Sequence, residues 1–160
     1  VGAEQHEALY SEMARLLYPG GQALIALPLR GSFQEILDLF REYALKNDDG
    51  DLGRAIDEAA ANRPTLETLS EELEAVGLED VDVEVRQETL RFDNGRGLIE
   101  DPISRLLILP ELRRGLGNRD LERPLEYLRE AADRYWSEAQ FELSINIGCA
   151  SARRVWVETS

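Results

Sequence analysis

A helix that ends at Pro-Gly-Gly and passes directly into an apolar strand restricts the fold of this chain more than any other feature. Its apolar residues recur at helical spacing, which predicts a surface helix with one apolar stripe, formed by Leu9, Met13, Leu16 and Leu17. Pro19 cannot extend the helix, and Gly20 can adopt the left-handed conformation that closes a helix end. Such a connection is typical of an open α/β sheet.

Residues 22–28, which follow this turn, are almost continuously apolar. A strand with one face in water alternates between apolar and polar residues, whereas a strand covered on both faces does not. We therefore expect residues 22–28 to form a strand buried on both sides in a parallel sheet. Ser32 and Glu35 match a capping box, so a second helix is expected directly after the strand, with an apolar repeat at Phe33, Ile36, Leu37, Phe40 and Ala44.

The next hundred or so residues contain further helices and two more strands. Residues 47–64 indicate a loop with a short helix near 52–61, and Thr65 or Thr68 caps a helix that Gly77 closes. The apolar side of that helix is formed by Leu69, Leu73 and Val76. Alternation from Val81 to Val85 predicts a strand that reaches Phe92.

Residues 93–140 form a long helical excursion before the closing strand. We expect a turn at Asn94-Gly95, a helix over 98–109, a Gly-rich turn at 115–117 and a helix over 121–139. Strict alternation from Phe141 to Ala150 predicts the last strand.

Charge and composition exclude several classes of function. The net charge of −14 disfavours binding to nucleic acid or to anionic membranes, since both require a basic surface. Cys149 is the only cysteine and His6 the only histidine, which excludes an internal disulfide and argues against a zinc site or a Ser-His-Asp triad. With no apolar run of about 18 residues and no signal-like segment, we expect a cytoplasmic protein. Arginine used in place of lysine suggests a GC-rich bacterial genome.

Residues 16–21, Leu-Leu-Tyr-Pro-Gly-Gly, together with the apolar strand after them, resemble the segment through the fifth strand of class I S-adenosylmethionine-dependent methyltransferases. The family commonly has Lys or Arg where this chain has Tyr18. Val76-Gly77-Leu78 is similar to the Ala-Gly-Phe type turn before the sixth strand of the family. The long helical excursion resembles the substrate-covering helices of the subgroup near the biotin-synthesis malonyl-carrier-protein methyltransferase.

The resemblance implies an α/β fold that is the carboxyl-terminal half of a Rossmann-like methyltransferase sheet. Its three strands would be the fifth, sixth and seventh of the family, with the last two antiparallel and a helical insertion between them. Residues 1–154 would form this half-domain, 93–140 the substrate-cover insertion and 155–160 an unassigned tail. In the family's strand order the seventh strand lies between the fifth and the sixth. The inner edge would then be open, so we expect self-association or pairing with a missing amino-terminal half. The alternative is a separate small domain that reuses these units.

The resemblance also implies S-adenosylmethionine as the cofactor of the parent protein. The family binds it with a first strand that ends in a Gly-rich turn and with an acidic residue at the tip of the second strand, and neither feature is present. We expect Gly95-Arg96-Gly97 and Gly115-Leu116-Gly117 to be turn glycines, since neither is predicted to follow a strand and open a helix in the required way. No cofactor or metal is therefore expected on this chain alone, and no catalytic residue is assigned.

Candidate acceptor-binding residues come from the strand end and from the insertion. Ligands of this architecture sit beyond the carboxyl ends of parallel strands, which places Arg30, Ser32 and Phe33 at the rim of the site. Arg30 would steer a carboxylate or a phosphopantetheine-bearing substrate, although an ordinary surface arginine is the simpler interpretation. For Ser32 a helix cap is the simpler interpretation, and for Phe33 a hydrophobic staple or a core position is an equal alternative.

The insertion adds Arg96 and Tyr135 as candidates, together with Tyr127 and Trp136 beside them. These side chains would cover an apolar substrate, while packing is the alternative for the three aromatic residues.

Two functions remain open from the sequence. The chain is the acceptor-side portion of a methyltransferase that acts on a small molecule or a carrier-bound acid, with no activity of its own, or it is a non-catalytic acidic interaction domain that uses an open sheet edge.

Overall fold

The computed structural model describes residues 3–156 and divides them into two compact units. The first unit contains residues 3–30, 62–87 and 146–156, and the second contains 31–61 and 88–145. The second and third strands contribute residues to both units, and each unit has helices of its own.

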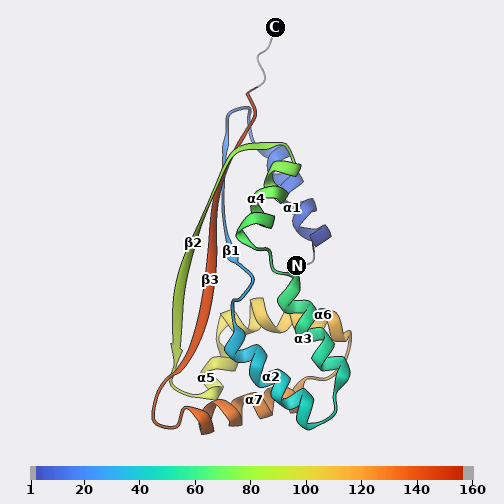
Figure 1. The fold of residues 1–160 in the computed structure, drawn as a ribbon, viewed down its shortest axis with the longest axis vertical. Helices are drawn as coiled ribbons and strands as arrows, with labels where there is room; N and C mark the ends of the chain where they lie inside the picture. Colours follow the sequence, from blue (N-terminus) through green and yellow to red (C-terminus); the bar gives the residue numbers. More distant parts are fainter. Residues whose placement is uncertain (1–2, 157–160) are drawn as a thin grey trace. The chain divides into compact units, whose positions relative to one another are not determined.

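The strands form one three-stranded sheet. Strand β1 spans Gln22–Pro28, β2 spans Leu78–Phe92 and β3 spans Phe141–Arg154, and their order in the sheet is β1-β3-β2 (Figure 1). Strand β3 runs antiparallel to β1, with Gln22 opposite Arg153 and Pro28 opposite Ile147. The predicted fold class is confirmed: three strands, the last two antiparallel, with helices inserted between them.

In the first unit, helices α1 (Ala3–Leu16) and α4 (Leu66–Ala75) pack against each other and against the sheet. Thr65 caps α4 through a capping box with Thr68, and Gly77 has a φ of +84° after the helix, as the sequence predicted. The core of this unit is apolar and consists of Tyr10, Leu29, Leu69, Leu73, Leu78, Ala150 and Ala152.

The buried face of α1 differs from the predicted one. Leu9 is 53% exposed and Leu16 is 65% exposed, whereas Tyr10 is buried. The side chains that contact the core lie at Tyr10, Met13, Ala14 and Leu17, which share one helical face at spacings of three, four and seven residues. The helix is rotated from the expected orientation because the large Tyr10 ring, rather than Leu9, fills the space over α4.

The environment of β1 also corrects the sequence prediction. Strand β1 pairs antiparallel with β3, and among the described strands it has no parallel neighbour. Its exposure alternates, with Ala23 buried and Leu24 exposed, because α1 and α4 cover only one face of the strand. An apolar sequence therefore does not mean here that both faces are buried.

The second unit is mainly helical. It contains α2 (Gln34–Lys46), nearly all of α3 (Gly50–Asn62), α5 (Gly95–Glu100), the π-helix η1 (Ser104–Ile108), α6 (Leu109–Leu116) and α7 (Glu122–Tyr135). Helix α7 packs against both α2 and α5. The largest fully buried side chains of the second unit are Phe33, Phe40, Phe141, Ile36, Leu37, Leu52, Ile56, Leu98 and Ile108.

Four local predictions fail in this unit. The Gly-rich turn expected at 115–117 begins inside a helix, since Gly115 and Leu116 belong to α6. The N-cap of α2 is Phe33 rather than Ser32, because the Glu35 carboxylate accepts hydrogen bonds from Ser144 and does not complete a capping box. Asn94 caps α5, so the expected turn is a helix start. The predicted single helix over 98–109 is divided into α5 and η1, with Asp101 as the C-cap of α5.

The predicted unassigned tail, 155–160, lies partly outside the described residues, since residues 157–160 are not described. Trp156 packs against Gly20 of the Pro-Gly-Gly turn. If Gly20 carried a Cβ, this atom would lie only 2.5 Å from Nε1 of the Trp156 indole. Gly20 has the predicted left-handed conformation, with a φ of +78°. Among the described helices, none is both long enough and apolar enough to cross a membrane.

Candidate functional site

Arg30 follows the carboxyl end of β1 and belongs to the first unit. Its backbone N–H donates to the carbonyl oxygen of Pro64 at 2.8 Å, and its carbonyl oxygen accepts from Asn146 Nδ2 at 3.4 Å. The residue is exposed. The backbone of Arg30 is therefore anchored at both polar groups, and the guanidinium is carried at the surface beyond the strand end.

Ser32 and Phe33 belong to the second unit and are both fully buried. Phe33 has a φ of +64°, an uncommon conformation for a bulky side chain, and its N–H donates to the carbonyl oxygen of Ser144 at 2.8 Å. This bond and the packing of the ring hold the strained backbone at the start of α2. Ser32 and Phe33 thus shape the connection after β1 from within the core, without lining an open surface.

Arg96 lies on α5 beside a shallow hollow of about 390 Å³ in the second unit. Its Nε donates to Glu100 Oε1 at 2.9 Å, and its side chain is 76% exposed. The rest of the hollow is formed by Ile99, Glu122, Leu125, Glu126 and Arg129. An apolar floor with two guanidinium groups and three carboxylates is suited to a small molecule that carries both an apolar part and charged groups.

Tyr135 is separated from this hollow and takes part in a hydrogen-bond network between α2 and α7. Its hydroxyl donates to Glu42 Oε1 at 2.7 Å. Lys46 Nζ donates to the same oxygen at 2.6 Å and contacts the Tyr127 hydroxyl at 2.7 Å. Sequence reasoning missed Glu42 and Lys46, although their spacing of four residues on one helix was a usable signal.

The network changes the pKa values of its members. Hydrogen bonds from Lys46, Tyr127 and Tyr135 lower the pKa of Glu42 to about 2, and the bond to Glu42 raises the pKa of Lys46. The pKa of Tyr135 is raised because its hydroxyl proton is shared with the Glu42 carboxylate. Glu42 is therefore ionised and Tyr135 protonated at neutral pH.

Two further aromatic residues that the sequence singled out form contacts inside the second unit. The Trp136 ring packs edge-on against Phe141 with 4.4 Å between centroids, and the Tyr127 ring lies 5.5 Å from Tyr43. These contacts agree with the packing interpretation of both residues.

The first Gly-x-Gly sequence is Gly95-Arg96-Gly97. We expected that it would not follow a strand and open a helix, and the structure shows that this expectation was wrong. The segment follows β2 after the two residues Asp93 and Asn94 and begins α5. The Gly95 N–H donates to Asp133 Oδ1 at 2.6 Å, and the Gly97 N–H donates to Asn94 Oδ1 at 2.7 Å. Since acidic or amide side chains of the protein already accept from these donors, the segment does not fit a phosphate or S-adenosylmethionine loop.

The second Gly-x-Gly sequence closes α6. A Cβ on Gly115 would lie 2.9 Å from the Cβ of Ala55 on α3, and Gly117 has a φ of +65°. Both glycines thus serve helix packing and helix termination. Within residues 3–156 there is also no cluster of three His, Cys, Asp or Glu side chains that could hold a metal ion.

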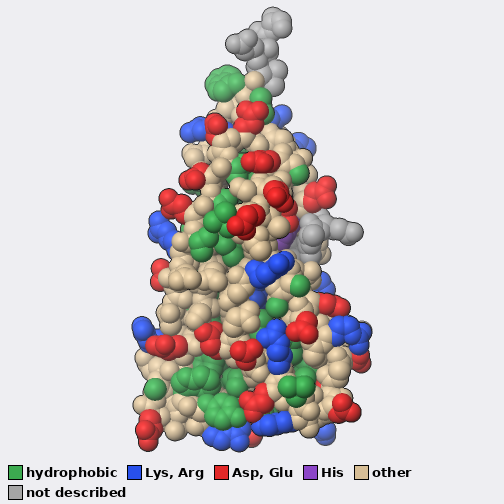
Figure 2. All heavy atoms as spheres, in the orientation of Figure 1, with side chains coloured by type: hydrophobic (Ala, Val, Ile, Leu, Met, Phe, Trp, Pro, Cys, Tyr) green, Lys and Arg blue, Asp and Glu red, His purple; other side chains and the backbone are tan. Residues whose placement is uncertain are grey.

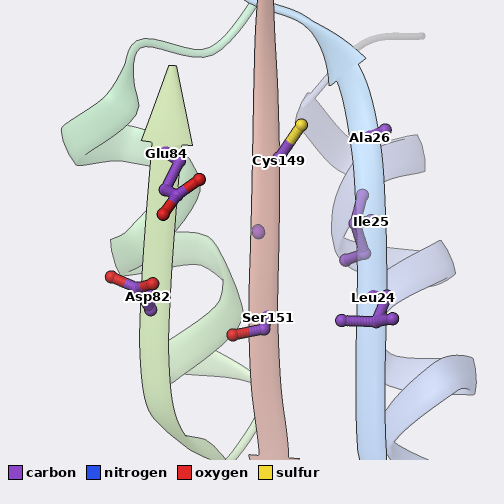
Figure 3. Close-up of a pocket in the computed structure, with 8 residues that line it drawn as sticks. Leu24, Ile25, Ala26, Asp82, Glu84, Cys149 and Ser151 are labelled. Carbon is purple, nitrogen blue, oxygen red and sulfur yellow. The ribbon is translucent and has the colours of Figure 1, made fainter. Parts of the chain in front are cut away.

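A separate hollow of about 450 Å³ lies on the sheet in the first unit. Figure 3 shows side chains from all three strands around it: Leu24 and Ala26 from β1, Asp82 and Glu84 from β2, and Cys149 and Ser151 from β3. None of the candidate residues taken from the sequence borders this hollow.

Within the second unit, the structure does not bring its four candidates together. Arg30 belongs to one unit and the other four to the second, where two are buried, one borders the hollow beside α5 and one joins the network of Glu42.

Comparison with known proteins gives matches to solved structures only. No protein-family model matches the chain, and no curated protein matches its sequence. The chain is similar to phosphoethanolamine N-methyltransferase 2 from Haemonchus contortus, in complex with phosphomonomethylethanolamine and S-adenosylhomocysteine, with 17% identity and a TM-score of 0.38. A second structure of that enzyme, in complex with S-adenosyl-L-methionine, matches with 18% identity and a TM-score of 0.38.

These matches cover 93% and 96% of this chain but only 30% and 32% of the chains that it resembles. The chain thus spans about a third of the length of these structures.

Proposed function

We propose that this chain is the carboxyl-terminal, acceptor-side portion of an S-adenosylmethionine-dependent methyltransferase that acts on a small molecule or a carrier-bound acid. The observation that carries the proposal is the strand order β1-β3-β2, with the last strand of the chain inserted antiparallel beside β1. The resemblance at residues 16–21 implies this same order for the fifth, seventh and sixth strands of the family. A helical segment between β2 and β3 is a second point of agreement.

The cofactor is held elsewhere in this proposal. S-adenosylmethionine supplies an electrophilic methyl group, so the protein has chiefly to position the acceptor, and no nucleophile or metal is needed. Each unit would supply one candidate acceptor contact: Arg30 beyond the strand end in the first unit, and Arg96 beside the hollow on α5 in the second. Both are exposed, as charge-assisted hydrogen bonds to a carboxylate or phosphate require.

We further propose that the outer edge of β1 is paired in the working protein, by a second copy or by the cofactor-binding half. The Arg154 N–H donates to the Gly21 carbonyl oxygen, and the Leu29 N–H donates to the Asn146 carbonyl oxygen. By this register, the odd-numbered residues from 21 to 29 point their backbone N–H and C=O groups toward β3. The N–H groups of Leu24 and Ala26 consequently face the outer edge. Residues 22–28 carry no charge to protect that edge, which makes it a template for strand addition.

The test is methyl transfer by the complete protein that carries this sequence. With labelled S-adenosylmethionine and a panel of small carboxylic and phosphate-bearing acceptors, Arg30→Ala should raise the acceptor KM by about tenfold and leave kcat nearly unchanged. Arg86→Ala, on the exposed side of β2, is the matched control. Absence of methyl transfer to every acceptor would refute the proposed activity, and an unchanged KM would remove Arg30 from the acceptor site.

The open edge also supports a second candidate, a non-catalytic acidic interaction domain. Under that hypothesis the complete protein shows no methyl transfer, while the edge of β1 still recruits a partner.

A further inference from the structure

The exposed face of the sheet in the first unit is a surface that the proposed function does not use. Both helices described in that unit, α1 and α4, pack on the opposite face, where Ile25, Val81 and Val83 join the core. On the exposed face, the side chains of Leu24 and Cys149 border the hollow of about 450 Å³ (Figure 3). This inference is independent of methyl transfer.

The side of the hollow formed by β1 is apolar. Leu24 is 73% exposed, Ala26 is exposed beside it, and their partners on β3 are Ser151 and Cys149. These two cross-strand pairs are of the kind that does not exchange backbone hydrogen bonds, which brings their side chains close together into one strip. A strip of this composition is stabilised when another apolar surface covers it.

The side of the hollow formed by β2 is acidic. Asp82 and Glu84 are exposed and share the face of the sheet with Leu24. The nearest cation recorded for Glu84 is Arg86, at 4.0 Å and itself largely exposed, so this carboxylate is only weakly compensated. A partner that covers the apolar strip would therefore gain from positive charge on the flank that faces β2.

A second copy of the chain does not meet this requirement. If two copies met face to face, each would bring its own Asp82 and Glu84 to the interface, and each carries a net charge of −14. Edge-to-edge pairing of two β1 strands would leave the hollow uncovered. Figure 2 shows acidic side chains interspersed with Lys and Arg side chains over the face in view, with apolar side chains exposed between them.

We propose that this hollow binds an amphipathic helix of a partner polypeptide, with its apolar face on Leu24, Ala26 and Cys149 and with Arg or Lys on the flank beside Asp82 and Glu84. Helices are the usual cover for a sheet face in α/β proteins, and charge complementarity determines the orientation of the helix across the strands.

The test uses Cys149, the only cysteine of the chain, as a reporter within the hollow. The probe is a synthetic basic helix of about 18 residues, with Leu and Ala on one face and Arg along one flank. The control is an acidic peptide that has Glu in place of each Arg. The basic peptide should slow the reaction of Cys149 with a thiol reagent by about fivefold at saturation, and the acidic peptide should not.

The charge contribution is tested by the double variant Asp82→Asn/Glu84→Gln, which should weaken binding of the basic peptide by about tenfold. The control, Glu7→Gln/Glu138→Gln, removes the same number of charges from exposed positions outside the hollow and should leave the affinity unchanged. Leu24→Ser tests the apolar strip and is expected to fold normally, because this side chain is exposed.

Three outcomes would overturn the proposal. The first is that both peptides slow the reaction of Cys149 with the thiol reagent equally. The second is that the basic peptide binds but leaves this reaction rate unchanged. The third is that the reaction slows as the concentration of the chain alone is raised. The last result would show that a second copy covers the face.

Discussion

At the scale of single residues, Gly95 shows why a Gly-x-Gly sequence can mark packing instead of a cofactor. A Cβ at Gly95 would lie 2.3 Å from the carbonyl oxygen of Arg129, closer than any side chain can approach. Glycine at this position is what allows the start of α5 to lie against the backbone of α7.

We therefore expect Gly95→Ala to lower the free energy of unfolding by about 2–3 kcal/mol through overpacking. Gly53 on α3 has open space around its Cβ position, so Gly53→Ala should instead raise it by about 0.5–1 kcal/mol through helix propensity. Urea denaturation of both variants is the measurement. Equal effects of the two substitutions would contradict the close packing of α5 and α7.

Phe33 is a second position where the backbone makes the substitution informative. Both Phe33→Ala and Phe33→Gly remove the buried ring, at a cost of about 3–5 kcal/mol. Only glycine adopts the φ of +64° without penalty, so Phe33→Gly should be more stable than Phe33→Ala by about 1 kcal/mol. Urea denaturation would disprove the strain if the alanine variant were the more stable of the two.

At the scale of elements, the contact between α2 and α7 should depend on pH through Glu42. Its pKa is lowered from 4.5 to about 2 in the folded protein. A carboxyl with a lowered pKa contributes stability above its unfolded pKa, and this contribution is lost as the pH falls through the folded pKa.

Glu42→Gln should therefore be less stable than the unsubstituted protein at pH 7, and the difference should disappear between pH 4.5 and pH 2. Thermal unfolding at several pH values measures this difference. Glu138→Gln, at an exposed position, is the control and should show no such pH dependence. A difference that stayed constant down to pH 2 would mean that the lost interaction is not the carboxylate.

At the scale of the whole molecule, the chain has two compact units. In the Gly-x-Gly segment that follows β2, the N–H groups of Gly95 and Gly97 already donate to Asp133 and Asn94. Calorimetry of the isolated chain with about 1 mM S-adenosylmethionine should show no heat of binding beyond dilution. A complete methyltransferase measured in the same buffer provides the positive control. A saturable isotherm would contradict the proposal that the cofactor is held elsewhere.

The order and type of most elements were predictable because the signals are local. The cap at Thr65, the stop at Gly77, the left-handed Gly20 and the alternation from Phe141 onward each depend on a few neighbouring residues. The strand order followed from the resemblance at residues 16–21 rather than from composition, and the structure has that order.

The candidate site was less predictable, because it depends on which surfaces meet. Arg30 and Arg96 are exposed as a ligand contact requires. The apolar repeat allowed a core position for Phe33, but the sequence contained no sign of its left-handed backbone. It also contained no sign that Tyr135 would donate to Glu42, 93 residues away in the chain.

The sequence by itself determined the order and type of most helices and strands, since capping, turn chemistry and hydrophobic period act over a few residues. Only the tertiary structure decided which faces are covered. Tyr10 rather than Leu9 packs inward on α1, and the Pro-Gly-Gly turn leads into a strand whose Leu24 remains in solvent beside acidic side chains. The reason is that burial depends on contacts between distant segments, which a local apolar pattern allows but does not select.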